Sequence, residues 1–352
     1  MAKSKKSAAT LSSGPLTIDD LDERLSRPSP QLIEFLGRLQ GDILILGVGG
    51  KMGPSLAELA VRGLNAAKSK SRVIGVSGFS QRGVQRQLEK IGVVCHKADL
   101  LQPGELDKLP DAPNVLQMIG KKFGSTGAEW DTWNTNVFLI GQVARRFRKS
   151  RVVAFSSGNI YPFVGIGSGG CDESTPPGPV GEYAMTCLGR ERMFDLAANE
   201  FGARVVHYRL NYANELRYGI IHDIAQKVWN KLSIDVTMGH VNLVWQGYAN
   251  SVAIQCLDLA TAPANILNVA GPETVSVRWL ASQLAKRMKR EITIVGDEAP
   301  NALLNNATKC HGLFGYPDVS LNTLIDWVAA WVMRGGASLG KPTHYATRDG
   351  KF

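Results

Sequence analysis

Short runs of branched apolar residues alternate with amphipathic segments between residues 43 and 208 of this chain. The runs occupy residues 43–46, 73–76, 93–95, 115–119, 152–155 and 205–208. Between the first two runs, Leu56, Leu59, Ala60 and Leu64 share one face of a predicted helix. Strands that are apolar on both faces and joined by helices are typical of parallel sheets. The pattern therefore predicts an α/β fold with a doubly wound parallel sheet.

Composition narrows the class of protein further. The 352 residues are 44% hydrophobic and 20% charged, which suits a chain that buries a core. No apolar run approaches the roughly 18–20 residues that are needed to cross a bilayer. Lys3, Lys5 and Lys6 are not followed by an apolar stretch, so we expect no secretory signal and a cytoplasmic protein with no membrane contact.

The formal net charge of +9 is spread along the chain rather than clustered. Residues 1–14 hold three lysines and no acid, residues 341–352 add a further +2, and the body between them is near +4. The sequence has no zinc-finger or RNA-binding motif. We therefore expect a small anionic ligand that carries phosphates, and no nucleic acid.

Five scattered cysteines form no C-x-x-C pair, and no two of the six histidines are four residues apart. Neither a disulfide framework nor a structural zinc site fits this spacing, so we expect no metal.

A glycine-rich segment follows the first apolar run and precedes the first predicted helix. A sharp turn from strand to helix, which must approach a pyrophosphate closely, favours residues without a side chain. Free N–H groups at the start of the helix then bind phosphate oxygens. The spacing fits either Gly47-x-Gly49-x-x-x-Gly53 or Gly47-x-x-Gly50-x-x-Gly53. Both predict a dinucleotide site, with Lys51 and Met52 inside the turn.

The second spacing resembles the fingerprint of the extended short-chain dehydrogenase/reductases, the family of UDP-galactose 4-epimerase and the nucleotide-sugar dehydratases. Further similar segments follow in the family's order between residues 41 and 335. The resemblance implies that the cofactor is bound by Gly47, Gly50, Lys51, Met52, Gly53, Asp99, Leu100, Ile119, Gly120 and Asn136. Among these, Asp99 resembles the acid that contacts adenine, and Asn136 resembles the asparagine of the family's Asn-Val motif.

The end of the second predicted strand bears on the choice between NAD and NADP. An acid there binds the ribose hydroxyls of the adenosine and repels a 2′-phosphate. Ser77 stands at this position, and Ser77 with Arg82 could hold a 2′-phosphate. We therefore favour NADP slightly over NAD, although a merely solvated Arg82 would leave the choice open.

Two residues resemble the family's catalytic pair. Ser157 lies in a segment similar to the family's Ser-Ser-x-x-Val-Tyr, and Tyr183 begins what should be Tyr-x-x-x-Lys. In the family the tyrosine exchanges a proton with the substrate hydroxyl or carbonyl, and the serine hydrogen-bonds the same oxygen. The resemblance implies these roles, and a cofactor contact, for Tyr183.

Cys187 stands where the family has its lysine. That lysine lowers the pKa of the tyrosine and holds the nicotinamide ribose, and a neutral thiol does neither. We expect Cys187 to be a small buried residue, because nothing next to it would activate a nucleophile. Lys122, which matches a cofactor-contacting lysine of UDP-galactose 4-epimerase, and Arg190 are the candidate replacement cations.

The sequence pattern divides the chain into five parts. They are a disordered basic tail (1–14), an N-terminal helical extension (15–40), a dinucleotide-binding Rossmann domain (41–211), a mixed C-terminal part with a substrate subdomain (212–335) and a C-terminal tail (336–352).

The resemblance implies an NAD(P)-dependent epimerase, dehydratase or oxidoreductase that acts on a hydroxyl or ketone of a sugar-like substrate, nucleotide sugars included. The alternative is a non-catalytic NAD(P)-binding sensor or scaffold, because the active-site lysine is absent. Family members commonly pair through two helices, which here span residues 136–146 and 183–198, so we expect a homodimer.

Overall fold

A seven-stranded parallel sheet forms the centre of the computed structural model, which describes residues 14–122, 124 and 126–351. The strands are β1 (Ile43–Leu46), β2 (Val73–Ser77), β3 (Val94–Lys97), β4 (Asn114–Gln117), β5 (Arg151–Ser157), β7 (Arg204–Leu210) and β12 (Asn265–Val269). Their order is β12-β7-β5-β4-β1-β2-β3, and every neighbouring pair is parallel. The predicted α/β fold with a doubly wound sheet is confirmed, and the six predicted strands are observed with small shifts at their ends.

The edge strand β12 is absent from the prediction because two asparagines interrupt its apolar pattern. Asn268 is fully buried, and its Oδ1 accepts a hydrogen bond of 2.9 Å from the Tyr161 hydroxyl. Its Nδ2 donates to the carbonyl of Cys171 at 2.9 Å. Partners that lie about a hundred residues away satisfy this amide, so a polar residue is tolerated inside the sheet.

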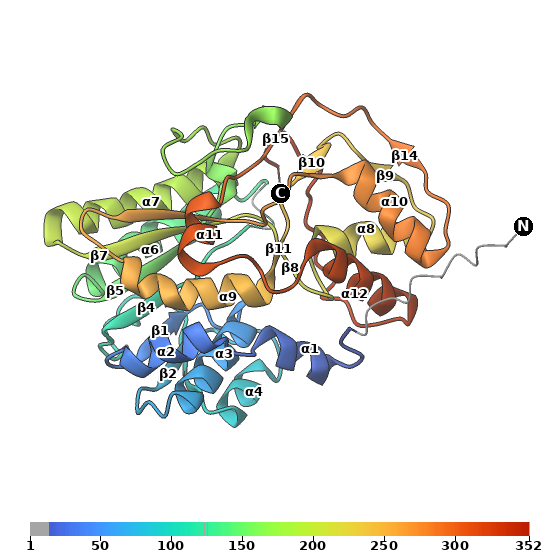
Figure 1. Ribbon diagram of the computed structural model, residues 1–352. Coiled ribbons are helices and arrows are strands. Elements are labelled where there is room, and N and C mark those ends of the chain that lie inside the picture. The colour runs from blue at the N-terminus through green and yellow to red at the C-terminus, as the bar shows by residue number, and fades with distance from the viewer. Residues whose placement is uncertain (1–13, 123, 125, 352) are drawn as a thin grey trace, which may run out of the picture.

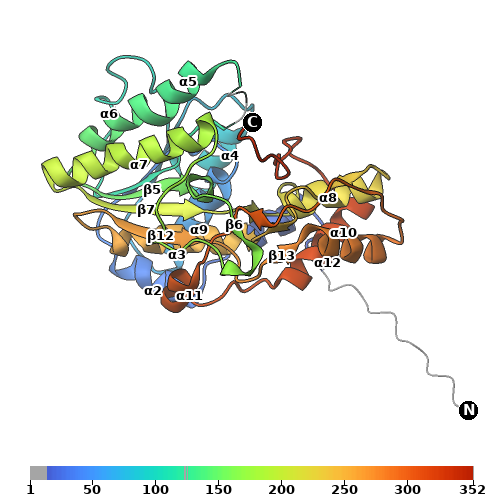
Figure 2. The same ribbon diagram turned by 90° about the horizontal axis from the view of Figure 1, so that it is seen from above.

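Alternate residues of each strand face opposite layers of helices. On β1, Ile43 and Ile45 join one buried cluster, whereas Leu44 and Leu46 join another. The first layer contains α1 (Ile18–Leu25), α2 (Pro30–Arg38), α3 (Gly53–Ala66), α4 (Val84–Lys90) and α9 (Gln246–Gln255). The second contains α6 (Leu139–Arg146) and α7 (Glu182–Phe201). Figures 1 and 2 show these two layers on either side of the sheet.

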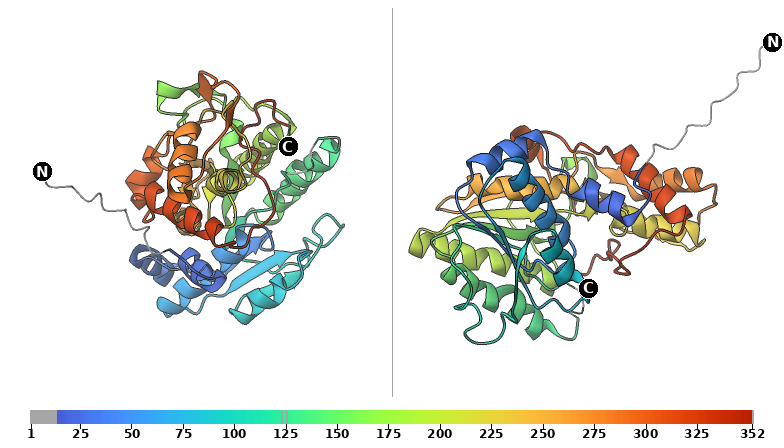
Figure 3. Two further views of the ribbon diagram at one scale, coloured as in Figure 1. Left: turned by 90° about the vertical axis from the view of Figure 1, so that its right-hand side faces the viewer. Right: turned by 90° about the horizontal axis from the view of Figure 1, so that it is seen from below.

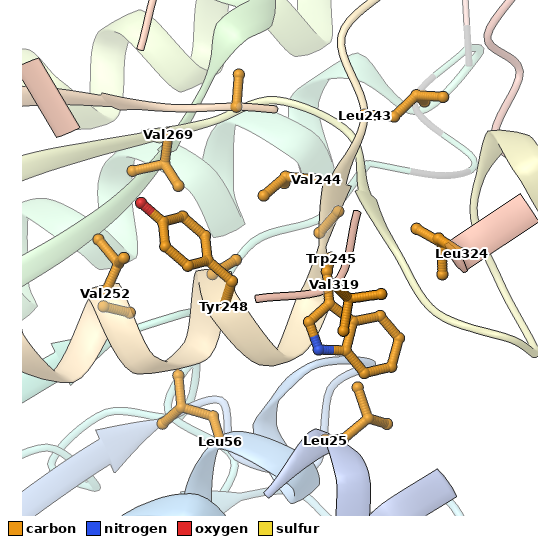
Figure 4. Close-up of a cluster of buried hydrophobic side chains, with 14 of the residues drawn as sticks. Leu25, Leu56, Leu243, Val244, Trp245, Tyr248, Val252, Val269, Val319 and Leu324 are labelled. Atoms are coloured by element: carbon orange, nitrogen blue, oxygen red, sulfur yellow. The ribbon is translucent and has the colours of Figure 1, made fainter. Parts of the chain in front are cut away.

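The predicted N-terminal helices are built into the core. Thr17 caps α1 through a reciprocal pair of hydrogen bonds with Asp20, and Pro30 opens α2 after the cap at Ser29. Leu25 of α1 and Leu56 of α3 point toward Trp245, which heads α9 (Figure 4). The extension therefore fixes α3, the helix that follows the glycine turn, against the C-terminal half of the chain.

A second lobe packs beside the carboxyl ends of the strands (Figures 1 and 3). Its helices α8 (Ile220–Trp229), α10 (Val277–Met288) and α12 (Leu321–Met333) contact one another. Short strands pair around them and along the boundary: β6 (Val164–Gly165) with β15 (Asn301–Ala302), β8 (Ala213–Asn214) with β11 (Val244–Trp245), β9 (Ile234–Asp235) with β14 (Ile294–Val295), and β10 (His240–Val241) with β13 (Val275–Ser276). The remaining helices are α5 (Glu129–Trp133), a π-helical turn at Asn134–Phe138 and α11 (Thr308–Phe314).

The last residues form a C-terminal strap, residues 339–351, that runs from the second lobe back to the sheet. The backbone N–H and the hydroxyl of Thr343 both donate to Oδ2 of Asp223 on α8, at 2.7 and 2.6 Å. The Tyr345 hydroxyl donates to the carbonyl of Asp235, and Arg348 donates to the carbonyl of Asn301 at 2.9 Å. Figure 2 shows the chain end between the two lobes. Within the expected C-terminal tail, the strap is thus held to the second lobe by several hydrogen bonds.

Candidate active site

A cavity of about 220 Å³ lies at the carboxyl edge of the sheet, between the glycine turn and the start of α8. Five residues singled out from the sequence line it together: Lys51, Met52, Lys122, Ser157 and Tyr183. Ligands of doubly wound proteins bind at this edge, where the strand order reverses between β1 and β4. The topology therefore assembles these side chains, which come from four separate segments, around one space.

The glycine turn has the shape of a phosphate cradle. Gly47 has a φ of +84°, and a Cβ atom placed on it would come within 3.0 Å of the backbone nitrogen of Ile119. A Cβ on Gly53 would lie 2.2 Å from the carbonyl oxygen of Val48. Gly50 is exposed at the tip, and no side chain caps the N-terminus of α3. The turn thus fits the pyrophosphate of a dinucleotide, with the N–H groups of α3 directed at it.

The residues expected around the adenosine lie outside the cavity. Ser77 ends β2, and its Oγ would be 2.6 Å from a Cβ placed on Gly49, so Ser77 directly neighbours the turn. Arg82 is exposed beyond it. The exposed Asp99 bonds within its own loop, where its carboxylate accepts from the N–H of Leu101 at 3.2 Å, while Leu100 is buried. Of these residues, Ser77 is the one that the structure brings against the glycine turn.

Tyr183 and Ser157 meet inside the cavity. The Ser157 side chain hydrogen-bonds the Tyr183 phenol, and its Oγ also accepts from the N–H of Asn159 at 3.1 Å. Burial raises the pKa of Tyr183 well above its ordinary value, while the charge of Arg190 and the bond with Ser157 oppose that rise. The two hydroxyl groups therefore lie side by side at the cavity.

Cys187 is completely buried one turn along α7, in a small apolar cluster with Ile160, Tyr161 and Cys171. Burial raises the pKa of its thiol, so the sulfur is held as a neutral group. This agrees with the expectation of a small buried residue. The thiol also lies close enough to the Tyr183 phenol to raise the pKa of the phenol further.

Lys122 supplies a cation beside Tyr183. Its Nζ lies 5.6 Å from the centre of the Tyr183 ring and donates to the carbonyl of Thr343 in the C-terminal strap at 3.4 Å. Burial lowers the pKa of Lys122 to about 8, while the charge of Asp223 favours its charged form. Arg190, the other candidate cation, donates instead to the carbonyl of Phe155 at 2.8 Å. Of these two candidates, Lys122 therefore lines the cavity with Tyr183.

Asn136 positions the loop that carries Lys122. Its Oδ1 accepts from the backbone N–H of Lys121 at 2.7 Å, and its Nδ2 donates to the carbonyl of Lys121 at 2.8 Å. The same Nδ2 donates to the hydroxyl of Thr186 on α7 at 2.9 Å. Asn136, which we expect at the cofactor, thus connects the loop after β4 and after the expected contacts Ile119 and Gly120 to the helix of Tyr183. This arrangement makes Asn136 a positioning residue.

Lys51 reaches across the cavity from the glycine turn. Its Nζ donates to the carbonyl of Ala213 at 3.3 Å and lies 3.8 Å from the centre of the Tyr218 ring. Burial lowers the pKa of Lys51 to about 7. Lys51 is part of the glycine turn, but its charge therefore lies on the opposite wall of the cavity, among residues that follow β7.

Sequence reasoning missed several cavity residues, notably Asn211, Tyr218 and Thr343. Asn211 follows β7 directly, and its place after a buried strand was the signal that could have found it. Thr343 lies in the strap, and nothing in its local sequence indicates that it returns to the sheet.

The glycine turn, the Ser157–Tyr183 pair and the strand order define a protein of the extended short-chain dehydrogenase/reductase type. Residues 43–216 match the model of the NAD dependent epimerase/dehydratase family. This region, which carries six of the seven strands of the central sheet and most of the residues that line the cavity, therefore belongs to the NAD dependent epimerase/dehydratase family. No protein among the curated sequences matches the chain. No helix within the described ranges is long and apolar enough to span a membrane.

Solved structures share the fold at low sequence identity. A UDP-glucuronic acid 4-epimerase variant from Bacillus cereus, crystallised with NAD and a fluorinated substrate analogue, is 17% identical with a TM-score of 0.71, over 83% of this chain and 99% of that one. A UDP-glucose 4-epimerase from Thermotoga maritima is 13% identical with a TM-score of 0.69, over 84% and 99%. A UDP-galactose 4-epimerase is 20% identical with a TM-score of 0.65, over 84% and 99%.

The lowered pKa of Lys51 predicts a pH-dependent stability cost in cofactor-free protein. The unfolded chain keeps Lys51 protonated up to its ordinary pKa of about 10.4, whereas the fold disfavours the charge above about 7. Lys51→Met should therefore stabilise the fold at pH 6 by on the order of 1 kcal/mol, and the gain should shrink as the pH rises toward 10. Urea unfolding at pH 6 and pH 9.5 measures both values. The exposed Lys90→Met is the control, and an equal gain at both pH values would contradict the prediction.

Proposed function

We propose that this protein is an NAD(P)-dependent enzyme that oxidises or reduces a hydroxyl or ketone of a sugar-like substrate, in the manner of an epimerase or dehydratase. The observation that carries the proposal is the shared cavity, in which residues of the glycine turn face Tyr183, Ser157 and Lys122. The family of residues 43–216 supports it. So do the similar folds that were crystallised with NAD and nucleotide sugars.

The residues of this chain fit a nicotinamide dinucleotide. The glycine turn and the N-terminus of α3 would hold the pyrophosphate, Ser77 would face the adenosine ribose, and Ile119 with Gly120 would line the path between them. When it is bound, the cofactor supplies hydride transfer. The protein contributes the position of the substrate and the handling of its proton.

Tyr183 would take the proton of the substrate hydroxyl during oxidation and return it during reduction. Ser157 would donate a hydrogen bond to the same substrate oxygen, which holds that oxygen against the phenol. The Lys122 ammonium would stabilise the phenolate that forms, in place of the lysine that is missing at Cys187. Because the cation is already in place, the absence of that lysine does not require a non-catalytic function.

The cofactor assignment predicts the effect of a change at the tip of the turn. Gly50→Asp would place a side chain and a negative charge at the pyrophosphate, and it should abolish NAD and NADP binding in isothermal titration. Gly167→Asp is the control, because that glycine is exposed in a short 3₁₀ turn with open space around it. Unchanged affinity in a folded Gly50→Asp variant would refute the assignment of the turn.

The residue at the end of β2 predicts cofactor choice. NADP should bind at least as tightly as NAD, since Ser77 puts no negative charge beside the turn. Ser77→Asp should shift the ratio of the two affinities toward NAD by about tenfold. Titration of both cofactors measures the ratio, with the exposed Ser168→Asp as a control. A strong preference of the unaltered protein for NAD would contradict the role of Arg82.

The proposed roles of Tyr183 and Cys187 predict opposite outcomes. Tyr183→Phe should lower turnover by roughly 10²–10⁴-fold, the usual worth of a positioned acid–base group. Cys187→Ala should be nearly silent, because the thiol is buried and neutral. Steady-state product formation measures both on any substrate found by screening. An inactive Cys187→Ala beside an active Tyr183→Phe would mean thiol chemistry, and two silent changes would favour the sensor or scaffold.

We also propose that the protein is a homodimer. Large apolar side chains are exposed along α5, the π-helical turn and α7: Trp130, Trp133, Phe138, Met185, Leu196 and Phe201. These helices contact one another and lie side by side in Figure 2. Exposed patches of this kind mark interaction surfaces.

If this surface forms the dimer interface, charges introduced into it should separate the two subunits. The double variant Phe138→Glu and Leu196→Glu should elute as a monomer in light scattering at micromolar concentration, because both charges would be buried without partners. Leu313→Glu, at an equally exposed leucine on α11, should leave the dimer intact. A monomeric unaltered protein would contradict the proposal.

A further inference from the structure

The cavity is rich in hydrogen-bond donors and poor in acceptors that carry charge. It is lined by two lysines, Lys51 and Lys122, and by three tyrosines, while the described lining residues include no aspartate or glutamate. Two cations that face one small space disfavour each other's charge, and Lys122 lowers the pKa of Lys51. A negative group in the cavity would relieve this repulsion.

Lys51 has no ion pair among the described residues, and the nearest carboxylates are engaged elsewhere. Glu215 pairs with Arg217 at 3.2 Å. Asp223 accepts two hydrogen bonds from Thr343. Both carboxylates favour the charged form of Lys51 by Coulomb attraction, without an ion pair to it. The ammonium is thus held partly buried by a carbonyl and a ring, which leaves it able to bind an anion.

A second donor in the lining of the same cavity lacks a partner among the described residues. Asn211 is 2% exposed and lines the cavity, and its Nδ2 has no hydrogen-bond partner among the described residues. Buried amide groups without partners are rare, and at a cavity wall such a group indicates a ligand that accepts from it. Asn211, Ala213 and Tyr218 all follow β7, so the donors gather on the wall opposite the glycine turn.

We propose that Lys51 and Asn211 bind a carboxylate of the substrate, and that the enzyme acts on a sugar acid or a similar polyhydroxy carboxylate. This inference rests on the proposed function. A carboxylate accepts from both an ammonium and an amide, and the glycine turn already provides a separate place for the phosphates of the cofactor. Lys122 lies beside Tyr183, so the two lysines divide recognition and proton transfer between them.

The test isolates the negative charge of the ligand. D-Glucuronate and D-glucuronamide differ only in the carboxylate, and UDP-glucuronic acid with UDP-glucose repeats the comparison for nucleotide-linked sugars. Each is titrated by calorimetry into the full chain saturated with its preferred nicotinamide cofactor. We expect at least one acid to bind about tenfold more tightly than its neutral partner. The free and UDP-linked pairs distinguish a small substrate from a nucleotide sugar.

Variants of Lys51 assign the preference to this side chain. Lys51→Met should abolish the preference for the acid and leave cofactor affinity unchanged, whereas Lys51→Arg should keep much of the preference. Equal binding of acid and neutral partner, or no binding of any probe below about 1 mM, would overturn the inference. Loss of cofactor affinity in Lys51→Met with the preference intact would assign Lys51 to the pyrophosphate. Failure of the unaltered protein to bind either cofactor would instead refute the proposed function.

Discussion

The pairing of β1 with β4 is the constraint on which the site depends. These strands are neighbours in the sheet although β2 and β3 lie between them in sequence, so the chain reverses its direction of winding at this point. The glycine turn after β1 then meets the end of β4 so closely that a single Cβ on Gly47 would collide with the backbone at Ile119. Lys122 follows three residues later, which brings its charge to the turn, to Tyr183 and to the second lobe.

Two lysines, Lys51 and Lys122, are buried in the wall of the same cavity. Burial lowers the pKa of both Lys51 and Lys122, so the fold gives up stability to hold them there. Such perturbed groups cluster at functional sites, because a partly desolvated charge acts strongly on a ligand. The C-terminal strap contributes to this environment, since the carbonyl of Thr343 accepts from Lys122 and closes one side of the cavity.

Much of the fold follows from local pattern. Apolar runs buried on both faces predict the central strands. The glycine turn, Ser157, Tyr183 and Lys122 could also be selected from the sequence, because each lies after the carboxyl end of a strand or at the start of a helix. Contacts between segments that are distant in the sequence could not be predicted in this way. Asn268 is tolerated in β12 only because Tyr161 and Cys171 satisfy its amide, and the reach of Lys51 to Ala213 depends on how the second lobe docks.

The central claim is that Lys122 replaces the lysine that is missing from α7. The most direct measurement is the pH dependence of turnover in Lys122→Met, alone and combined with Cys187→Lys, with Lys121→Met, at the neighbouring lysine that pairs with Asp131, as the control. The account predicts that Lys122→Met moves the rise in oxidation rate to higher pH, since the phenolate loses its stabilising cation, and that Cys187→Lys restores the original profile. An unchanged profile in Lys122→Met would contradict the account.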